Sequence, residues 1–203
     1  MTTTNNAPTL LHGCDTVVKL WRQQCLERGA RIAHREKDLG IWQSYSWQDY
    51  YEKARAIGVA LLSLGLERGQ PVSILSEDNK EWLYCDLGIA GAGGVSNGVY
   101  TTDSAEQLAY LVNDSGSAFL FVENDEQLDK YLTVRDQVPT LKKVIVFDRK
   151  GLRDFDDPMV MFLDELYALS EQIPDAEAQF SASIAQSQPA HTRILRSAPV
   201  PNG

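Results

Sequence analysis

Cysteine is scarce in this sequence, and the metal-binding and redox spacings that cysteine would supply are missing. Cys14, Cys25 and Cys85 are the three cysteines of the 203-residue chain, and no two of them form a CxxC pair. An odd, scattered set of thiols is typical of proteins from a reducing compartment. We therefore expect free cysteines and a cytoplasmic location.

Long apolar runs are missing as well. The apolar stretch at residues 118–122 has the length of a buried strand, whereas a membrane span needs roughly 18 consecutive apolar residues. Residues 1–8 are polar and contain neither a basic segment nor an apolar core, so no secretory signal is expected. The sequence predicts no transmembrane segment and leaves peripheral membrane contact open.

Positive charge is in short supply. The chain has 19 Lys and Arg against 28 Asp and Glu, which gives a net charge of −9. Proteins bind nucleic acids largely by neutralising phosphates with Lys and Arg, so this balance argues against a nucleic-acid partner. The composition is otherwise that of an ordinary soluble globular protein, and it leaves the oligomeric state open.

Several catalytic signatures are absent from the sequence. There is no GxSxG nucleophile elbow and no GxxxxGK[ST] phosphate loop. His12, His34 and His191 lie far apart, and none stands at a zinc-ligand spacing from a cysteine. We therefore assign no catalytic and no metal-binding residue.

What is present is an alternation of apolar strands and helices from residue 72 onward. Short apolar runs predict strands over 72–75, 118–122 and 144–147, and a further strand is predicted over 95–99. Helical spacing predicts helices over 80–92, 104–112 and 126–137, the second opened by a Ser104–Gln107 capping box. The alternation is typical of βαβ units, so we predict an α/β fold with a parallel sheet flanked by helices.

The flanking segments complete the expected organisation. A helix capped by Asp15 is followed by two short strands, 32–34 and 45–47, around a charged turn. Ser46 then opens a long helix that ends at Gly65, and residues 162–170 form a later helix. After residue 177 acidic residues disappear while Ser and Pro accumulate. We predict a disordered terminus at 1–8, one domain over 9–177 and an unstructured tail over 178–203.

Polar residues follow two of the predicted strands. Ser76, Asp78 and Asn79 come after the first, and residues 101–104 (Thr-Thr-Asp-Ser) come after the second. The carboxyl ends of parallel strands are where α/β folds bind ligands. Helix capping and turn formation explain the same residues without a ligand, and we favour that interpretation.

Two further clusters of residues resemble ligand-binding motifs, but structural roles explain them better. The cluster Gly88, Gly91, Gly93 and Gly94 ends a helix and has Ser96 where a dinucleotide fingerprint needs glycine, which favours close packing and a helix stop. The acidic trio Asp154, Asp156 and Asp157 lacks the spacing of a calcium loop, which favours a solvated turn.

The order of several motifs resembles the N-terminal part of AMP-forming long-chain fatty-acyl-CoA synthetases, members of the adenylate-forming ligases. The similar segments cover much of residues 9–170 and are Gly40–Tyr50, Leu64–Gly69, Ile74–Trp82, Gly98–Ser115 and Phe121–Lys130. The resemblance implies a reaction in which fatty acid and ATP form acyl-AMP and pyrophosphate, and coenzyme A then displaces AMP. It also implies ATP, Mg²⁺ and coenzyme A as the reactants and cofactors of a complete family member.

The residues that perform this chemistry in the family have no counterpart in the chain. The family's phosphate loop, ending in Pro-Lys-Gly, should follow soon after residue 185, where the chain instead ends in Pro201-Asn202-Gly203. The Tyr-Gly-x-Thr-Glu segment, the ribose-binding Asp and the C-terminal Lys are also missing. We expect an N-terminal fragment that is inactive alone and binds no cofactor of its own, whose aberrant tail reflects a frameshift. The alternatives are a non-catalytic interaction module on the ligase scaffold and a stand-alone nucleotide-binding domain.

Overall fold

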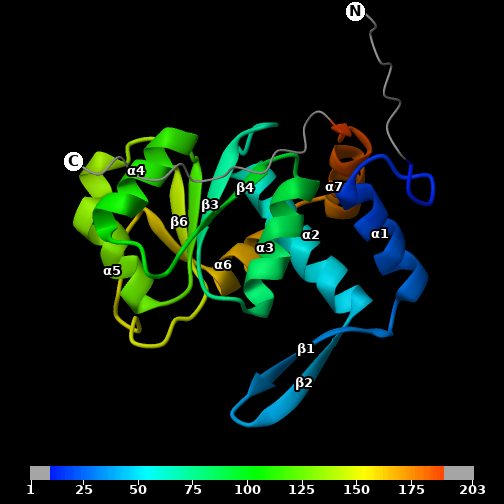
Figure 1. Cartoon of the computed structure of the whole chain (residues 1–203), viewed down its shortest axis with the longest axis horizontal. Helices are drawn as coiled ribbons and strands as arrows, with labels where there is room; N and C mark the ends of the chain where they lie inside the picture. Colours follow the sequence, from blue (N-terminus) through cyan, green and yellow to red (C-terminus); the bar gives the residue numbers. More distant parts are fainter. Residues whose placement is uncertain (1–9, 190–203) are drawn as a thin grey trace, which may run out of the picture.

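The computed structural model describes residues 10–189, and its centre is a five-stranded sheet (Figure 1). All neighbouring strands are parallel, in the order β4-β3-β5-β6-β7. The strands are β3 (Pro71–Leu75), β4 (Val95–Val99), β5 (Phe119–Val122), β6 (Lys143–Val146) and β7 (Val160–Phe162). The predicted parallel α/β sheet is confirmed, and the three-residue edge strand β7 was not predicted.

Helices cover both faces of this sheet. One face carries α4 (Ala105–Ser115) and α5 (Asp125–Val134), the latter continued by a 3₁₀ turn at Arg135–Gln137. The other face carries α2 (Trp47–Ser63), α3 (Lys80–Gly91) and α6 (Leu163–Glu171). An outer layer on α2 and α3 consists of α1 (Val17–Arg28) and α7 (Ala176–Ala185).

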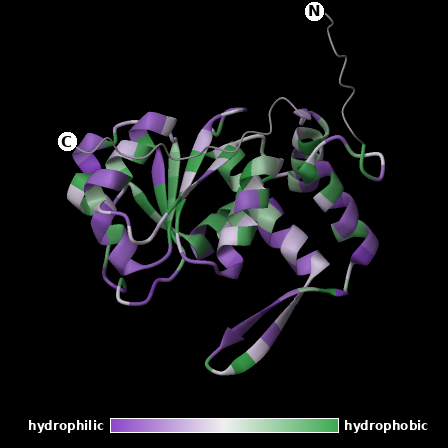
Figure 2. Ribbon diagram, viewed as in Figure 1, coloured by the Kyte–Doolittle hydropathy of each residue, from purple (hydrophilic) through white to green (hydrophobic). Residues whose placement is uncertain are grey.

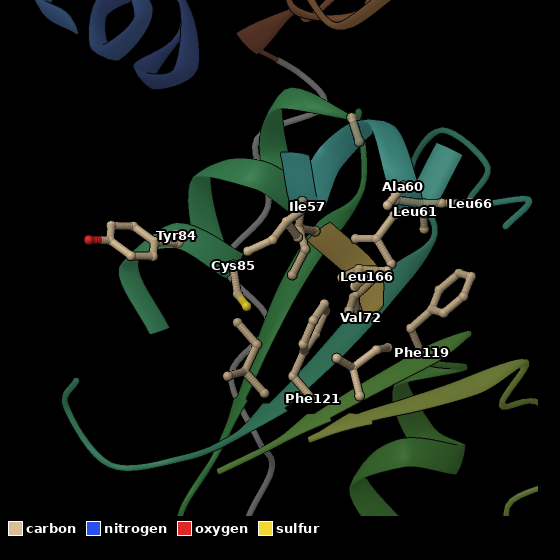
Figure 3. Close-up of a cluster of buried hydrophobic side chains, with 14 of the residues drawn as sticks. Ile57, Ala60, Leu61, Leu66, Val72, Tyr84, Cys85, Phe119, Phe121 and Leu166 are labelled. Atoms are coloured by element: carbon tan, nitrogen blue, oxygen red, sulfur yellow. The ribbon is translucent and has the colours of Figure 1, made fainter. Parts of the chain in front are cut away.

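Alternation along the strands divides the interior into two cores. Ile74 and Phe121 point to the side of α2, α3 and α6, where side chains converge on the sheet (Figure 3). Their neighbours Leu75 and Val122 point to the side of α4 and α5. Because both faces are buried, β3, β5 and β6 are mostly apolar, which is why they were predictable, whereas β4 contains Ser96, Asn97 and Gly98.

Capping side chains set the starts of the helices. Ser46 opens α2 and Ser104 opens α4, as predicted, and each forms a capping box with the residue three positions later, of which only the box at Ser104 was predicted. The predicted cap of α1 was wrong by one residue: Thr16 accepts the hydrogen bond from Lys19 N, while Asp15 pairs with the Lys19 ammonium at 2.8 Å.

A two-stranded antiparallel hairpin projects from the helical side of the molecule (Figure 1). It consists of β1 (Ile32–Asp38) and β2 (Ile41–Ser46). The strands are longer than the predicted segments 32–34 and 45–47, because most of the charged turn pairs in the ladder. Trp47, predicted to end the second strand, is instead the first residue of α2.

The expected unstructured tail is contradicted over its first part. Helix α7 occupies Ala176–Ala185, and Phe180 within it is fully buried against α2 and α3. The segment is rich in Ala, Ser and Gln and has no strong apolar periodicity. The Phe180 ring nevertheless fills a notch at Gly58 and Gly91, where the helices have no side chains. The predictions for residues 1–8 and 190–203, the latter including the frameshifted tail and His191, lie outside the described residues.

Candidate functional site

The candidate site is the carboxyl edge of the parallel sheet, where the polar residues predicted after β3 and β4 come together. The two strands are neighbours in register, with Leu75 opposite Val99, so the segments that follow them start side by side. β5 pairs with β3 on its other side and ends at Val122. Three strand ends therefore converge on one surface, as expected for parallel strands.

Most of the predicted residues have structural roles at this edge. Asn79 caps α3, its Oδ1 accepting a hydrogen bond from Trp82 N at 2.9 Å, and its Nδ2 donates to Ser76 Oγ at 2.8 Å. Ser104 caps α4 by accepting from Gln107 N at 3.3 Å. Asp78 and Thr102 are exposed. These contacts support the capping interpretation that the sequence favoured.

A hydrogen-bond network ties the three strand ends together. The Glu123 carboxylate, just after β5, accepts from Glu77 N at 2.7 Å and from Ser76 Oγ at 3.2 Å. The Thr101 hydroxyl donates to the Glu77 carboxylate, and the Lys130 ammonium donates to the carbonyl oxygen of Thr101. The network aligns the loops and leaves their side chains around an open recess.

The recess has a volume of about 520 Å³. Its lining residues are Glu77, Thr101, Thr102, Glu123, Asn124, Glu126, Gln127 and Lys130. Among them three carboxylates face one ammonium group, so the local field repels a polyphosphate. Gln127 is largely buried, and its Oε1 has no hydrogen-bond partner among the described residues. The lining of the recess is therefore acidic overall, with three carboxylates against one ammonium group.

Sequence reasoning did not single out Glu77, Glu123 or Lys130 as members of this edge. Each of the two glutamates lies within two residues of a strand end, which is a usable signal once the sheet order is known. Lys130 lies on α5 and reaches Thr101 across 29 positions of sequence, a contact that depends on how α5 packs. No local pattern predicts such a contact.

The glycine cluster allows helices to pack closely, as predicted. A Cβ on Gly88 would lie 2.6 Å from the Ala54 carbonyl oxygen of α2, and one on Gly91 would lie 2.3 Å from the Phe180 ring. Gly93 has a φ of +87°, which suits glycine at a helix stop. The cluster brings α2, α3 and α7 into close contact.

The acidic trio Asp154, Asp156 and Asp157 lies in the loop before β7. Asp157 accepts a hydrogen bond from Arg135 at 2.7 Å, and this contact holds the pKa of Asp157 below its ordinary value. Across residues 10–189, no group of three His, Cys, Asp or Glu side chains is arranged to hold a metal ion. His34 instead lies against Tyr84 at the base of the hairpin.

All three cysteines are free thiols. Cys85 is fully buried on α3, and burial raises its pKa, while burial raises the pKa of Cys25 to about 12. A thiol with a raised pKa is a poor nucleophile, so these two cysteines act as small apolar core residues. Of the helices described here, none combines the length and hydrophobicity that crossing a bilayer requires.

Comparison with known proteins identifies the family of this chain. The family model for AMP-binding enzymes matches residues 21–177. Long-chain-fatty-acid–CoA ligase ACSBG2 of Xenopus laevis is 34% identical over 162 residues, which are 80% of this chain and 22% of that protein. The human ligase ACSBG1 is 29% identical over 180 residues, 89% of this chain and 24% of that protein. The chain thus spans about a fifth to a quarter of the length of these curated relatives.

Solved structures show the same fold. The adenylation domain of a carboxylate reductase from Mycobacterium chelonae matches with a TM-score of 0.67 at 18% identity, covering 83% of this chain and 30% of that one. A putative long-chain-fatty-acid CoA ligase from Rhodopseudomonas palustris matches with a TM-score of 0.62 at 20% identity, covering 74% and 36%. The sheet, its helices and the family match agree over the same residues, and the chain belongs to the family of AMP-binding enzymes.

Proposed function

We propose that the chain is the N-terminal structural portion of a long-chain fatty acid–CoA ligase. The reaction in which it would take part joins a fatty acid to coenzyme A through an acyl-AMP intermediate, with ATP consumed and pyrophosphate and AMP released. The observation that carries this proposal is the family match over residues 21–177, together with 34% identity to a long-chain-fatty-acid–CoA ligase.

The chain's own contribution is a framework without an adenylating centre. Transfer of the adenylyl group needs cations and oriented N–H groups around the polyphosphate, and enzymes lower such barriers by about 8–23 kcal/mol. The carboxyl edge of the sheet offers three carboxylates and one ammonium group around its recess. ATP, Mg²⁺ and coenzyme A would therefore be bound by a complete ligase, and we assign none of them to this chain.

The cellular setting belongs to the same proposal. Three free thiols, two of them buried, are in keeping with a reducing cytoplasm. A long-chain fatty acid partitions into lipid bilayers, so a ligase that uses it gains from contact with a membrane surface. We therefore place the protein in the cytoplasm, in lipid metabolism, with peripheral access to membranes.

A stand-alone nucleotide-binding domain is the second candidate function. The observation in its favour is the recess at the carboxyl edge, with the unpartnered Oε1 of Gln127 beside it. The carboxylates of Glu77, Glu123 and Glu126 oppose it, because they repel phosphates. A third candidate is a non-catalytic interaction module that keeps the ligase scaffold and binds a protein or an acyl ligand.

Thermal unfolding with and without MgATP tests these candidates. A ligand that binds only the native state stabilises it, by about 2.7 kcal/mol at a concentration of 100 times its Kd. The scaffold proposal predicts the same melting temperature with MgATP, fatty acid or both. A rise with MgATP that is abolished by Gln127→Leu but kept in the exposed control Gln172→Leu would overturn it in favour of nucleotide binding.

A further inference from the structure

The tip of the β1–β2 hairpin displays large apolar side chains to solvent. Leu39 is 96% exposed, Ile41 65% and Trp42 64%, all within four consecutive positions. The hairpin extends away from the body of the molecule, and its turn is apolar (Figures 1 and 2). Single exposed apolar residues are common on proteins, whereas a contiguous cluster at the end of a projection indicates a contact surface.

The backbone at the tip is unfavourable for the residue that occupies it. Leu39 has a φ of +45° and Gly40 a φ of +85°, so both central turn positions are left-handed. Two-residue turns of this kind favour Asn, Asp or Gly at both positions. A leucine places its Cβ against the following carbonyl group and gains no packing within this chain. An apolar side chain is therefore held at the apex against the local preference.

The strand register separates two faces of the hairpin. Lys37 is directly opposite Trp42, and Arg35 is opposite Ser44, so these four residues share one face. Glu36, Asp38 and Ile41 lie on the other face, because side chains alternate along a strand, and Asp38 is directly opposite Ile41. The Trp42 face consequently carries two cations and no carboxylate within β1 and β2, although the chain as a whole has a net charge of −9.

The opposite face anchors the hairpin to the body. The Glu36 carboxylate accepts from the Lys80 ammonium at 2.8 Å, and His34 lies 3.1 Å from the Tyr84 hydroxyl through its Nε2. His34 also stacks on Tyr45 with ring centroids 5.1 Å apart. The base of the hairpin is held on α3, and the tip and the Trp42 face are presented outward.

We propose that this hairpin tip inserts into the interface of an anionic phospholipid bilayer. Leu39 at the apex would enter the boundary of the acyl chains, and Trp42 would lie at headgroup level, where amphipathic rings are stable. Lys37 and Arg35 on the Trp42 face would pair with headgroup phosphates. The purpose of this contact rests on the proposed function: it would bring the protein to the membrane, where a long-chain fatty acid is dissolved.

Vesicle flotation with the full chain tests the proposal. Wild-type protein should float with vesicles of phosphatidylcholine and phosphatidylserine, and Leu39→Ser with Trp42→Ser should weaken partitioning by about tenfold or more. Leu26→Ser is the matched control, because Leu26 is 61% exposed on α1 and lies outside the hairpin. It should bind as the wild type does. Far-UV circular dichroism and the melting temperature establish that each variant is folded.

A charge variant separates headgroup recognition from apolar insertion. Lys37→Gln with Arg35→Gln should lower partitioning into the anionic vesicles by about fivefold per charge, and it should change binding to pure phosphatidylcholine little. Wild-type protein that fails to float with either vesicle overturns the proposal, as does equal flotation of wild type and tip variant. A wild-type dimer that becomes a monomer in the tip variant would show a self-interface and also overturn it. None of these results bears on the ligase assignment, because flotation requires no adenylation.

Discussion

Phe180 shows how a single side chain can order a segment of weak local pattern. Its ring lies in a notch between α2 and α3, where a Cβ on Gly58 would come within 2.4 Å of the ring and one on Gly91 within 2.3 Å. The residues around Phe180 are small or polar and carry little helical amphipathicity. The sequence therefore suggested an unpacked tail, because the complementary notch is formed by residues more than 80 positions earlier.

Replacing Phe180 with alanine should lower the free energy of unfolding by about 3–5 kcal/mol, because a fully buried ring would leave a cavity between three helices. Ala182→Ser, at an exposed position of the same helix, should change it by less than about 0.5 kcal/mol. Urea unfolding measures both. A loss for Phe180→Ala no larger than that of the control would mean that α7 does not dock as described.

His34 should make stability depend on pH. Burial lowers the pKa of His34 from the ordinary value of 6.5, and the charge of Lys80 lowers it further. The nearby carboxylates of Glu36, Asp49 and Glu81 raise the pKa and offset only part of this shift. Its Nδ1 is buried without a partner among the described residues, so protonation would add an unpaired donor. The folded state then binds fewer protons than the unfolded state, and stability is lost as the pH falls below about 6.5.

The variant His34→Gln should flatten that part of the profile. Denaturant midpoints measured on either side of pH 6.5 should differ less for the variant than for the wild type. His12, which is exposed near the start of the described chain, offers the matched control His12→Gln. Equal pH dependence in wild type and His34→Gln would show that His34 is not the titrating group.

At the scale of elements, the N-cap of α2 can be tested directly. This helix contacts α1, α3, α6 and α7. Ser46 Oγ accepts from Asp49 N at 3.0 Å, and Asp49 accepts from Ser46 N at 2.8 Å. Ser46→Ala should lower the free energy of unfolding by about 1 kcal/mol. Ser63→Ala, in the last turn of α2, removes a hydrogen bond to the Ala60 carbonyl oxygen at 2.7 Å but no N-cap, and should have less effect. A loss at Ser63 that matches the loss at Ser46 would contradict the capping account.

The same cap should weaken in acid. Hydrogen bonds from the Ser46 side chain and backbone hold the pKa of Asp49 below its ordinary value of 3.8. A carboxylate with a lowered folded-state pKa contributes stability above its unfolded pKa, and that contribution is lost as the pH falls through the folded-state pKa. The difference between Ser46→Ala and wild type should therefore shrink below about pH 4 in the same unfolding measurement.

Elements that are buried on two faces were predictable, and those that depend on distant partners were not. β3, β5 and β6 are mostly apolar because helices cover both faces of the sheet. β7 has three residues and pairs only at the sheet edge, which leaves no periodic signal. The hairpin was predicted too short, since cross-strand pairing extends it through charged residues such as Lys37.

At the scale of the whole molecule, the candidate site followed partly from the sequence. The carboxyl edge was predictable, because parallel strands place the segments after Leu75 and Val99 side by side. The contacts that join Glu77 to Thr101 and Glu123 to Ser76 were not, because they depend on sheet order and side-chain rotamers. The resulting surface is structurally ordered and acidic, which suits a framework better than a phosphate-binding centre.

The central claim is that this chain has the framework of an AMP-binding enzyme and no adenylating centre of its own. Exchange of labelled pyrophosphate into ATP, with a long-chain fatty acid and Mg²⁺ present, tests it most directly. The full-length Xenopus laevis relative provides the positive control. We predict no fatty acid–dependent exchange above the protein-free blank for the purified chain. Sustained exchange that requires both the fatty acid and this chain would contradict the claim.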